Sequence, residues 1–169
     1  MRNVTIRDTN NIQRVIDSLS RLDRKNIKVG VVGPSDSELV MIAGVHEFGT
    51  EIQVTDKMRK WFAANGYPLK ASTTKIVIPE RSYLRSGYDE NIDDIADKIE
   101  EMLPDVLLND VAPSAFMEGI GLEFATLIRN KLKSIRDPAN SDMTTERKGS
   151  NNPLIDTGRL VGAIRHEVE

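Results

Sequence analysis

The sequence predicts an α+β fold, in which a small antiparallel sheet is flanked by amphipathic helices within a single domain. Three observations predict it. Short β-branched runs that end at glycine or proline, such as 27–32 and 74–78, indicate strands. Longer segments with apolar residues at helical spacing indicate helices, and the longest lie between 81 and 135. The length of 169 residues suits one domain, whose core can bury roughly 70% of the surface of the unfolded chain.

The N-terminal part of the chain predicts a helix, a strand and a second helix. The segment 9–11 can cap the first helix, whose apolar positions are Ile12, Val15, Ile16, Leu19 and Leu22. A strand follows at 27–32 and is expected to end at Gly33-Pro34. A second helix starts at Ser37, and Gly49 supplies the left-handed residue that commonly ends a helix.

The next segment predicts a hairpin with a helical insert at its tip. Strands at 50–54 and 74–78 are expected to pair with each other. Pro79 ends the second strand, because proline has no backbone donor for a ladder. The insert 55–74 begins with Thr55, whose hydroxyl can cap a short helix.

Two further helices are expected in the second half. A long acidic helix starts near 81–89, and Pro104 inside its apolar pattern should kink or end it. Another helix opens at Pro113 and continues to about 135, with a buried face that carries Phe116, Ile120, Phe124, Leu127, Ile128 and Ile135.

The C-terminal part predicts a loop, a short helix and an edge strand. The stretch 137–153 is rich in polar residues, proline and glycine, which predicts an exposed loop that is mobile in the isolated chain. Asp156 or Thr157 can cap a short helix that runs through Ile164. The last strand is expected at 166–169.

Composition excludes several classes of site. The chain has no cysteine, so disulfides, thiolate zinc sites, iron–sulfur clusters and cysteine nucleophiles are excluded. No apolar run approaches the roughly 20 residues that cross a bilayer. The first eleven residues lack the apolar centre of a secretory signal, so a cytosolic site of synthesis and use, or release by lysis, is expected. The glycines form no phosphate-binding pattern.

The net charge of −3 conceals alternating blocks. Residues 1–34 carry seven bases and three acids, and residues 35–56 carry five acids and no base. Residues 57–85 carry seven bases and one acid, and residues 86–110 carry nine acids and one base. Such blocks indicate either solvated faces or oppositely charged faces that meet between neighbouring copies.

The residues with catalytic potential form no recognisable active site. A zinc hydrolase helix needs two histidines four residues apart with a glutamate between them, but Thr50 stands four residues after His46. His46 is therefore expected to lie at a helix end and to form a local hydrogen bond. The acidic residues near 93–97 fall on the solvated side of an amphipathic helix. No catalytic, metal or cofactor residue is predicted.

The segment 79–85 joins the second hairpin strand directly to a helix. Pro79 fixes the exit from the strand, and Glu80 is expected near the positive end of the helix. Tyr83 and Leu84 are expected to pack into the core at this junction.

Arg81 and Arg85 lie four residues apart, which predicts that they share one face of that helix. Two interpretations remain open for both arginines. They form surface ion pairs, or they contact an acidic face of a neighbouring subunit, since arginine is enriched at interfaces. In the second case Arg85→Glu should abolish assembly and leave the fold unchanged.

Four segments occur in an order that resembles a known family. They are Val29-Gly30-Val31, His46-Glu47-Phe48-Gly49-Thr50, Ile78-Pro79-Glu80-Arg81-Ser82-Tyr83-Leu84-Arg85, and the stretch from Pro153 to Ile164 with Asp156-Thr157-Gly158 and Leu160. The series is similar to the tail-component and virion-morphogenesis families of long-tailed bacteriophages. There, a glycine-containing strand, (H/Y)EFGT, IP(A/E)RxFLR and PLxDTGxLxxSI recur in this order. The likeness covers about 29–168; Tyr83 replaces the usual Phe, and Gly162-Ala163 replace a more polar pair.

The resemblance implies a structural, non-enzymatic role at the neck of the virion, after assembly in the host cytoplasm. A subunit of this kind caps the tail tube or joins it to the head connector, and it needs no cofactor. Its partners would be copies of itself in a ring, often sixfold, together with tail tube and connector proteins. The interface and structural residues implied by the motifs are His46, Glu47, Phe48, Gly49, Pro79, Arg81, Tyr83, Leu84, Arg85, Asp156, Thr157, Gly158 and Leu160.

Two alternatives belong to other functional classes. A small metal-dependent hydrolase or nuclease would be built around His46 and Glu47, although the sequence places no second ligand beside them. A nucleic-acid-binding module would use the basic stretch 57–85. The acidic block that follows this stretch opposes that interpretation, because nucleic-acid binders present a continuous basic surface.

Overall fold

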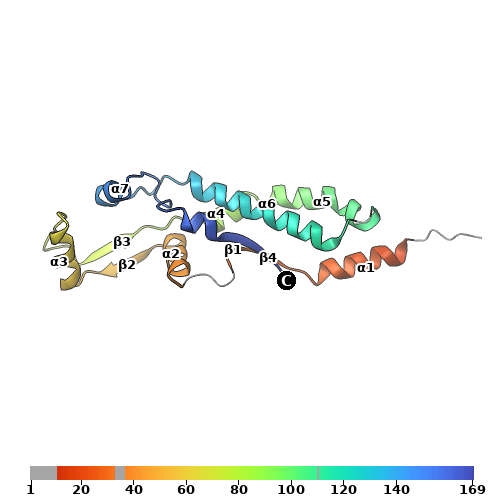
Figure 1. Cartoon of the computed structure of the whole chain (residues 1–169), viewed down its shortest axis with the longest axis horizontal. Coiled ribbons are helices and arrows are strands. Elements are labelled where there is room, and N and C mark those ends of the chain that lie inside the picture. Colours follow the sequence, from red (N-terminus) through yellow and green to blue (C-terminus); the bar gives the residue numbers. More distant parts are fainter. Residues whose placement is uncertain (1–10, 33–36, 110) are drawn as a thin grey trace, which may run out of the picture.

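The computed structural model describes residues 11–32, 37–109 and 111–169. Within these ranges eight helices and four strands form an α+β fold, as the sequence predicts. The strands make two separate two-stranded antiparallel sheets rather than one. Figure 1 shows an elongated molecule with a mostly helical body that contains one sheet and a narrow extension that contains the other. The expected helix-cap residues Thr9 and Asn10 and the expected strand end Gly33-Pro34 lie outside the described residues.

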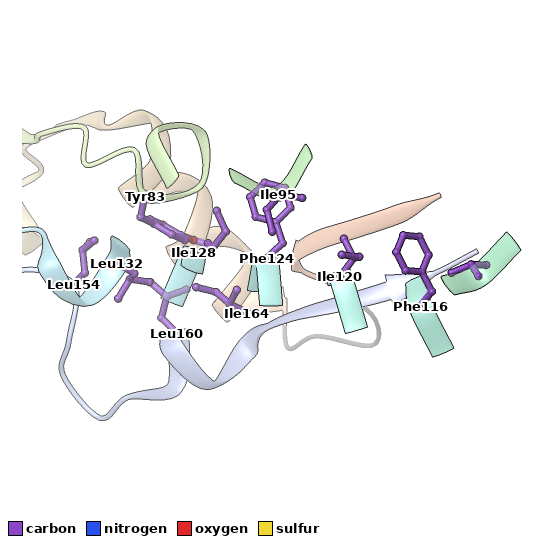
Figure 2. Close-up of a cluster of buried hydrophobic side chains, with 12 residues drawn as sticks. Tyr83, Ile95, Phe116, Ile120, Phe124, Ile128, Leu132, Leu154, Leu160 and Ile164 are labelled. Carbon is purple, nitrogen blue, oxygen red and sulfur yellow. The ribbon is translucent and has the colours of Figure 1, made fainter. Parts of the chain in front are cut away.

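The body is organised around the long helix α6, Pro113–Ser134. Its buried side chains follow one another every four residues: Phe116, Ile120, Phe124, Ile128 and Leu132. Figure 2 shows this row running through the buried cluster, with Tyr83, Leu154, Leu160 and Ile164 beside it. Full burial of each such side chain contributes roughly 1.5–3 kcal/mol, so α6 is the main apolar surface on which the body is built.

The first sheet and several helices pack on α6. Strand β1, Ile27–Val31, pairs antiparallel with β4, Ile164–Val168, and both strands contact α6. Helices α4, Tyr83–Asp89, and α5, Ile92–Leu108, contact α6 as well. Helix α1, Ile12–Asp23, lies along α5 and α6 at one end of the molecule. The predicted strands near 27–32 and 166–169 are confirmed, and the second begins two residues earlier.

The narrow extension, which we call the arm, consists of β2, Thr50–Gln53, α3, Asp56–Ala64, and β3, Lys75–Ile78. It follows helix α2, Ser37–Phe48. Strands β2 and β3 pair antiparallel, with Thr50 opposite Ile78, so the predicted hairpin with a helical insert is confirmed. The predicted cap is also confirmed, because the Thr55 hydroxyl accepts a hydrogen bond from the Met58 backbone N–H at 3.2 Å.

The helix predicted to start near 81–89 is two helices, and Pro104 does not end the second. The helix is interrupted at Glu90 and Asn91. There the Asn91 side-chain amide donates to the Gly87 carbonyl at 2.7 Å, at the C-terminal end of α4. Pro104 lies inside α5 on its exposed side. The carbonyl that loses its helical partner there belongs to Glu100 and can be solvated, so the helix continues.

The expectation of one exposed loop at 137–153 is wrong in part. The segment contains α7, Asp142–Lys148, whose N-terminus is capped by Ser141 and whose C-terminus ends at left-handed Gly149. Asn152 and Pro153 are buried. The polar residues therefore belong to a short capped helix and the turns on either side of it. The mobility of this segment stays a prediction.

The predicted cap of the last short helix is also wrong. Helix α8, Arg159–Ala163, begins after Gly158, which has φ of 80° and takes the N-cap position without any side-chain hydrogen bond. Asp156 and Thr157 instead lie exposed before this turn.

Two glycines of α6 provide a matched test of the packing between helix and sheet. A Cβ at Gly121 would lie 2.6 Å from His166 Cδ2 and 3.1 Å from Ile27 Cγ2, whereas a Cβ at Gly119 would meet nothing within 4 Å. Gly121→Ala is expected to lower the unfolding free energy by about 1–3 kcal/mol through overpacking. Gly119→Ala should raise it by about 0.5–1 kcal/mol, because alanine favours the helix. Urea denaturation of both variants measures the difference, and equal stabilities would contradict the close contact of β1 and β4 with α6.

Candidate functional site

Two of the four motif segments meet where the arm joins the body. Residues 46–49 end α2 and lead into β2, while residues 79–85 leave β3 and enter α4. We call these two segments together the arm junction. The Arg81 backbone N–H donates to the His46 carbonyl at 2.8 Å and connects them directly. Strand β2 therefore begins, and strand β3 ends, at the same place in the fold.

Glu47 is the central residue of the arm junction. It is 2% exposed. Its Oε2 accepts the Leu84 backbone N–H at 2.9 Å, and its Oε1 accepts the Arg85 backbone N–H at 3.0 Å. A carboxylate at this position satisfies two free donors in the first turn of α4 and lies at the positive end of the helix. Glu80, which the sequence also places near this end of the helix, pairs with the Arg85 side chain, and the N-terminal donors point toward Glu47.

Arg85 completes the pairing of the buried carboxylate. Its Nε donates to Glu47 Oε1 at 3.0 Å, and its Nη2 donates to the Glu47 carbonyl at 2.8 Å and to Glu80 Oε1 at 2.7 Å. Its guanidinium carbon lies 4.9 Å from the centre of the Phe48 ring. The Arg85 guanidinium thus pairs with Glu47 and Glu80 of its own chain. The expectation that Arg85→Glu leaves the fold unchanged is no longer reasonable, since it would place a second carboxylate against Glu47.

Arg81 is buried and lies outside α4, so both interpretations of this residue as a surface residue are wrong. Its Nε donates to the Pro138 carbonyl at 2.6 Å, and its Nη2 donates to the Ala139 carbonyl at 3.0 Å. A weaker bond of 3.3 Å joins Nη2 to the Asn140 side-chain oxygen. Burial lowers the pKa of Arg81, and three acceptors offset part of the cost of burying its charge. Arg81 therefore connects the segment after α6 to the arm junction.

The remaining motif residues of the junction determine its shape. Gly49 has φ of 68°, and a Cβ there would lie 2.8 Å from the Glu80 backbone nitrogen, so only glycine fits without displacement. Tyr83 is fully buried, as predicted, and burial raises the pKa of its hydroxyl. Leu84 is half-buried against the core cluster. Phe48, in contrast, remains exposed to solvent.

No protein-family model, curated protein or solved structure matches this chain. The arm junction is therefore interpreted from its own geometry.

The last motif segment lines a cleft of about 440 Å³ beside the junction. It is lined by His46, Lys148 and the stretch from 156 to 160, among others. The Lys148 ammonium donates to the carbonyls of Asn152 and Pro153 at 3.0 and 3.3 Å, and burial lowers its pKa. Leu160 is buried in the core, while Asp156 and Thr157 lie exposed. Three of the four motif segments, 46–50, 78–85 and 153–164, thus lie at the arm junction or around the cleft beside it.

His46 differs from the prediction of a local hydrogen bond. Its Nδ1 is buried and has no hydrogen-bond partner among the described residues. Burial, together with the positive charges of Arg81 and Lys148, lowers the pKa of His46 to about 4. The imidazole is consequently neutral at neutral pH, next to two cations that oppose its protonation.

The carboxylate of Glu47 has a positioning role at the junction. Glu47 already accepts three hydrogen bonds, two of them from backbone N–H groups, so its oxygens are engaged in positioning α4. In the part of the chain that the structure describes, no three His, Asp or Glu side chains gather in a way that could hold a metal ion. Among those same residues, no helix combines the length and apolar character that crossing a membrane requires. Asp93, Asp94 and Asp97 are exposed, as predicted for a solvated helix face.

Replacement of Glu47 tests the central role of its carboxylate. Glu47→Gln keeps the size but presents an amide nitrogen to one of the donors, which leaves that buried donor unpaired. The unfolding free energy is expected to fall by about 2–4 kcal/mol, measured by chemical denaturation. Glu80→Gln is the matched control, because Glu80 contacts the same Arg85 from an exposed position and such pairs contribute little. Similar losses for both variants would contradict the assignment.

His46 should make stability depend on pH. Above pH 6.5 the imidazole is neutral in both the folded and the unfolded chain. Between pH 6.5 and about 4 only the unfolded chain gains the proton, so the unfolding free energy falls as the pH falls through this window. His46→Gln should reduce the slope there, measured as the urea midpoint at several pH values. An unchanged slope would indicate that His46 is protonated in the folded protein.

Proposed function

We propose that this protein is a structural subunit of the neck of a long-tailed bacteriophage, which assembles with copies of itself into a ring at the head-proximal end of the tail. The observation that carries the proposal is the arm junction. Its motif residues are engaged in fixing the position of a projecting arm, through Glu47, Arg81 and Arg85. An arm that is fixed on a body suits a protein that works by contact with neighbours.

The surface of the arm and its base supports this proposal. Phe48 and Val77 are 66% and 55% exposed, and Ile52 and Trp61 are exposed as well. Large apolar side chains that gather on one projecting element commonly mark a protein–protein interface. The arm is also too narrow to bury them within its own chain, since its sheet has two strands.

The order of the sequence motifs gives the proposal its biological context. The series that includes residues 46–50, 78–85 and 153–164 resembles tail-component and virion-morphogenesis proteins of long-tailed phages. The function proposed on that basis is tail completion, with tail tube and connector proteins as further partners and the virion as the location. A ring of identical copies requires one face of each subunit to meet a different face of the next, and an elongated molecule with dissimilar ends is suited to such contacts.

The proposal predicts closed oligomers of one size. Sedimentation velocity at several protein concentrations, alone and with tail tube protein, should show a single discrete assembly above a threshold concentration. Negative-stain images should show rings, free or at the ends of tubes. A protein that stays monomeric under all of these conditions would refute the proposed function.

A further inference from the structure

The two ends of the molecule each carry an exposed apolar surface. We infer that helix α1 of one copy binds in an apolar groove that the arm and α7 of the next copy form together. The inference rests on the proposed function, because it identifies the surfaces that would join neighbouring subunits of the ring. It is an example of an amphipathic helix that binds in a groove through residues on one of its faces.

The groove lies between α3, β3 and α7. It has a volume of about 480 Å³ and is lined mainly by apolar and aromatic side chains: Trp61, Phe62, Tyr67, Leu69, Ile76 and Met143. Trp61 is 45% exposed at its edge. The Tyr67 hydroxyl donates to the Glu146 carboxylate and so connects the α3 side of the groove to α7. A volume of this size is sufficient for several aliphatic side chains.

The matching surface is a row of apolar residues on α1, which we call the α1 stripe: Ile12, Ile16 and Leu19. These positions, at i, i+4 and i+7, lie on one face of a helix. Their side chains are 63%, 48% and 44% exposed, respectively. The other apolar residues of α1, Val15 and Leu22, are half-buried toward the body. The sequence predicts a single apolar face for α1. Only the part of this face with Val15 and Leu22 packs toward the body, and the α1 stripe stays exposed.

The α1 stripe and the groove cannot meet within one molecule. Figure 1 places α1 at one end of the long axis and α3 and α7 at the other. A contact between them therefore joins two copies through different faces. Repetition of such a contact generates a ring if the rotation between copies closes, and a filament if it does not.

One pair of exposed, opposite charges supports a second copy as the occupant. Arg147 is the one charged residue among those that line the groove. Asp23 follows Leu19 by four residues and so extends the α1 stripe at its C-terminal end. Both side chains are exposed, and neither forms an ion pair with another described residue. An Asp23–Arg147 pair between copies would fix the direction in which the helix lies in the groove.

A charge exchange in the full-length protein tests this contact. Asp23→Arg and Arg147→Asp are each expected to weaken self-association roughly tenfold, because each places like charges together. The double variant restores the pair with reversed sign in every copy, and its association should return to the wild-type level. Asp17→Arg is the matched control, since it makes the same charge change on an exposed position of α1 outside the stripe. Sedimentation velocity measures association, and circular dichroism checks that each variant is folded.

The hydrophobic part of the contact is tested by Ile16→Asp, which should abolish association. Arg21→Asp is the control, because it places an aspartate at an exposed position on the opposite face of α1. Wild-type association that is unaffected by Asp23→Arg, Arg147→Asp and Ile16→Asp would overturn the inference and leave the proposed ring intact. A double charge variant that fails to recover would also overturn it. Variants that lose binding to tail tube protein but keep self-association would assign the groove to that partner instead. Absence of any wild-type association would refute the proposed function itself.

Discussion

The fold depends on how a buried carboxylate obtains its hydrogen bonds. Glu47 lies at the end of α2, far from water, and its charge is stable there only if several donors point at it. Those donors are the first backbone N–H groups of α4 and the guanidinium of Arg85. The end of one helix and the start of another are therefore held together, and the hairpin between them must leave and return at the same point. These hydrogen bonds, together with the bond from the Arg81 backbone N–H to the His46 carbonyl, fix where the arm leaves the body.

Local sequence signals predicted the elements that are determined by local interactions. The hairpin of β2 and β3, the Thr55 cap and the left-handed Gly49 follow from residue types whose conformational preferences act over a few positions. The roles of Glu47 and Arg81 could not be found in this way. Their partners lie 37 and 57 residues away, and only the tertiary fold brings them together. Spacing alone placed Arg81 on a helix face, because the pattern did not reveal that α4 begins two residues later.

The two sheets obtain their stability from different sources. The β1–β4 sheet packs on α6, where Gly121 allows the strands to approach closely. Among the described residues, no long helix packs on the β2–β3 sheet in this way. A two-stranded hairpin is marginally stable in water. Its return segment is held by Arg59, which donates to the carbonyls of Lys70, Ala71 and Thr73. The arm thus relies on polar bonds to its own backbone, which leaves apolar surface available to partners.

The position of the one tryptophan separates two spectroscopic signals. Trp61 is the sole residue of its type in the chain, and it lies on α3, far from the buried cluster around α6. Its emission spectrum therefore responds to solvent at the tip of the arm and is nearly insensitive to packing in the body. Tyr83, at the arm junction, is fully buried in the core cluster and contributes to near-ultraviolet dichroism. The molecule consequently contains an intrinsic fluorophore that reports on events at the tip of the arm, separately from changes in its interior.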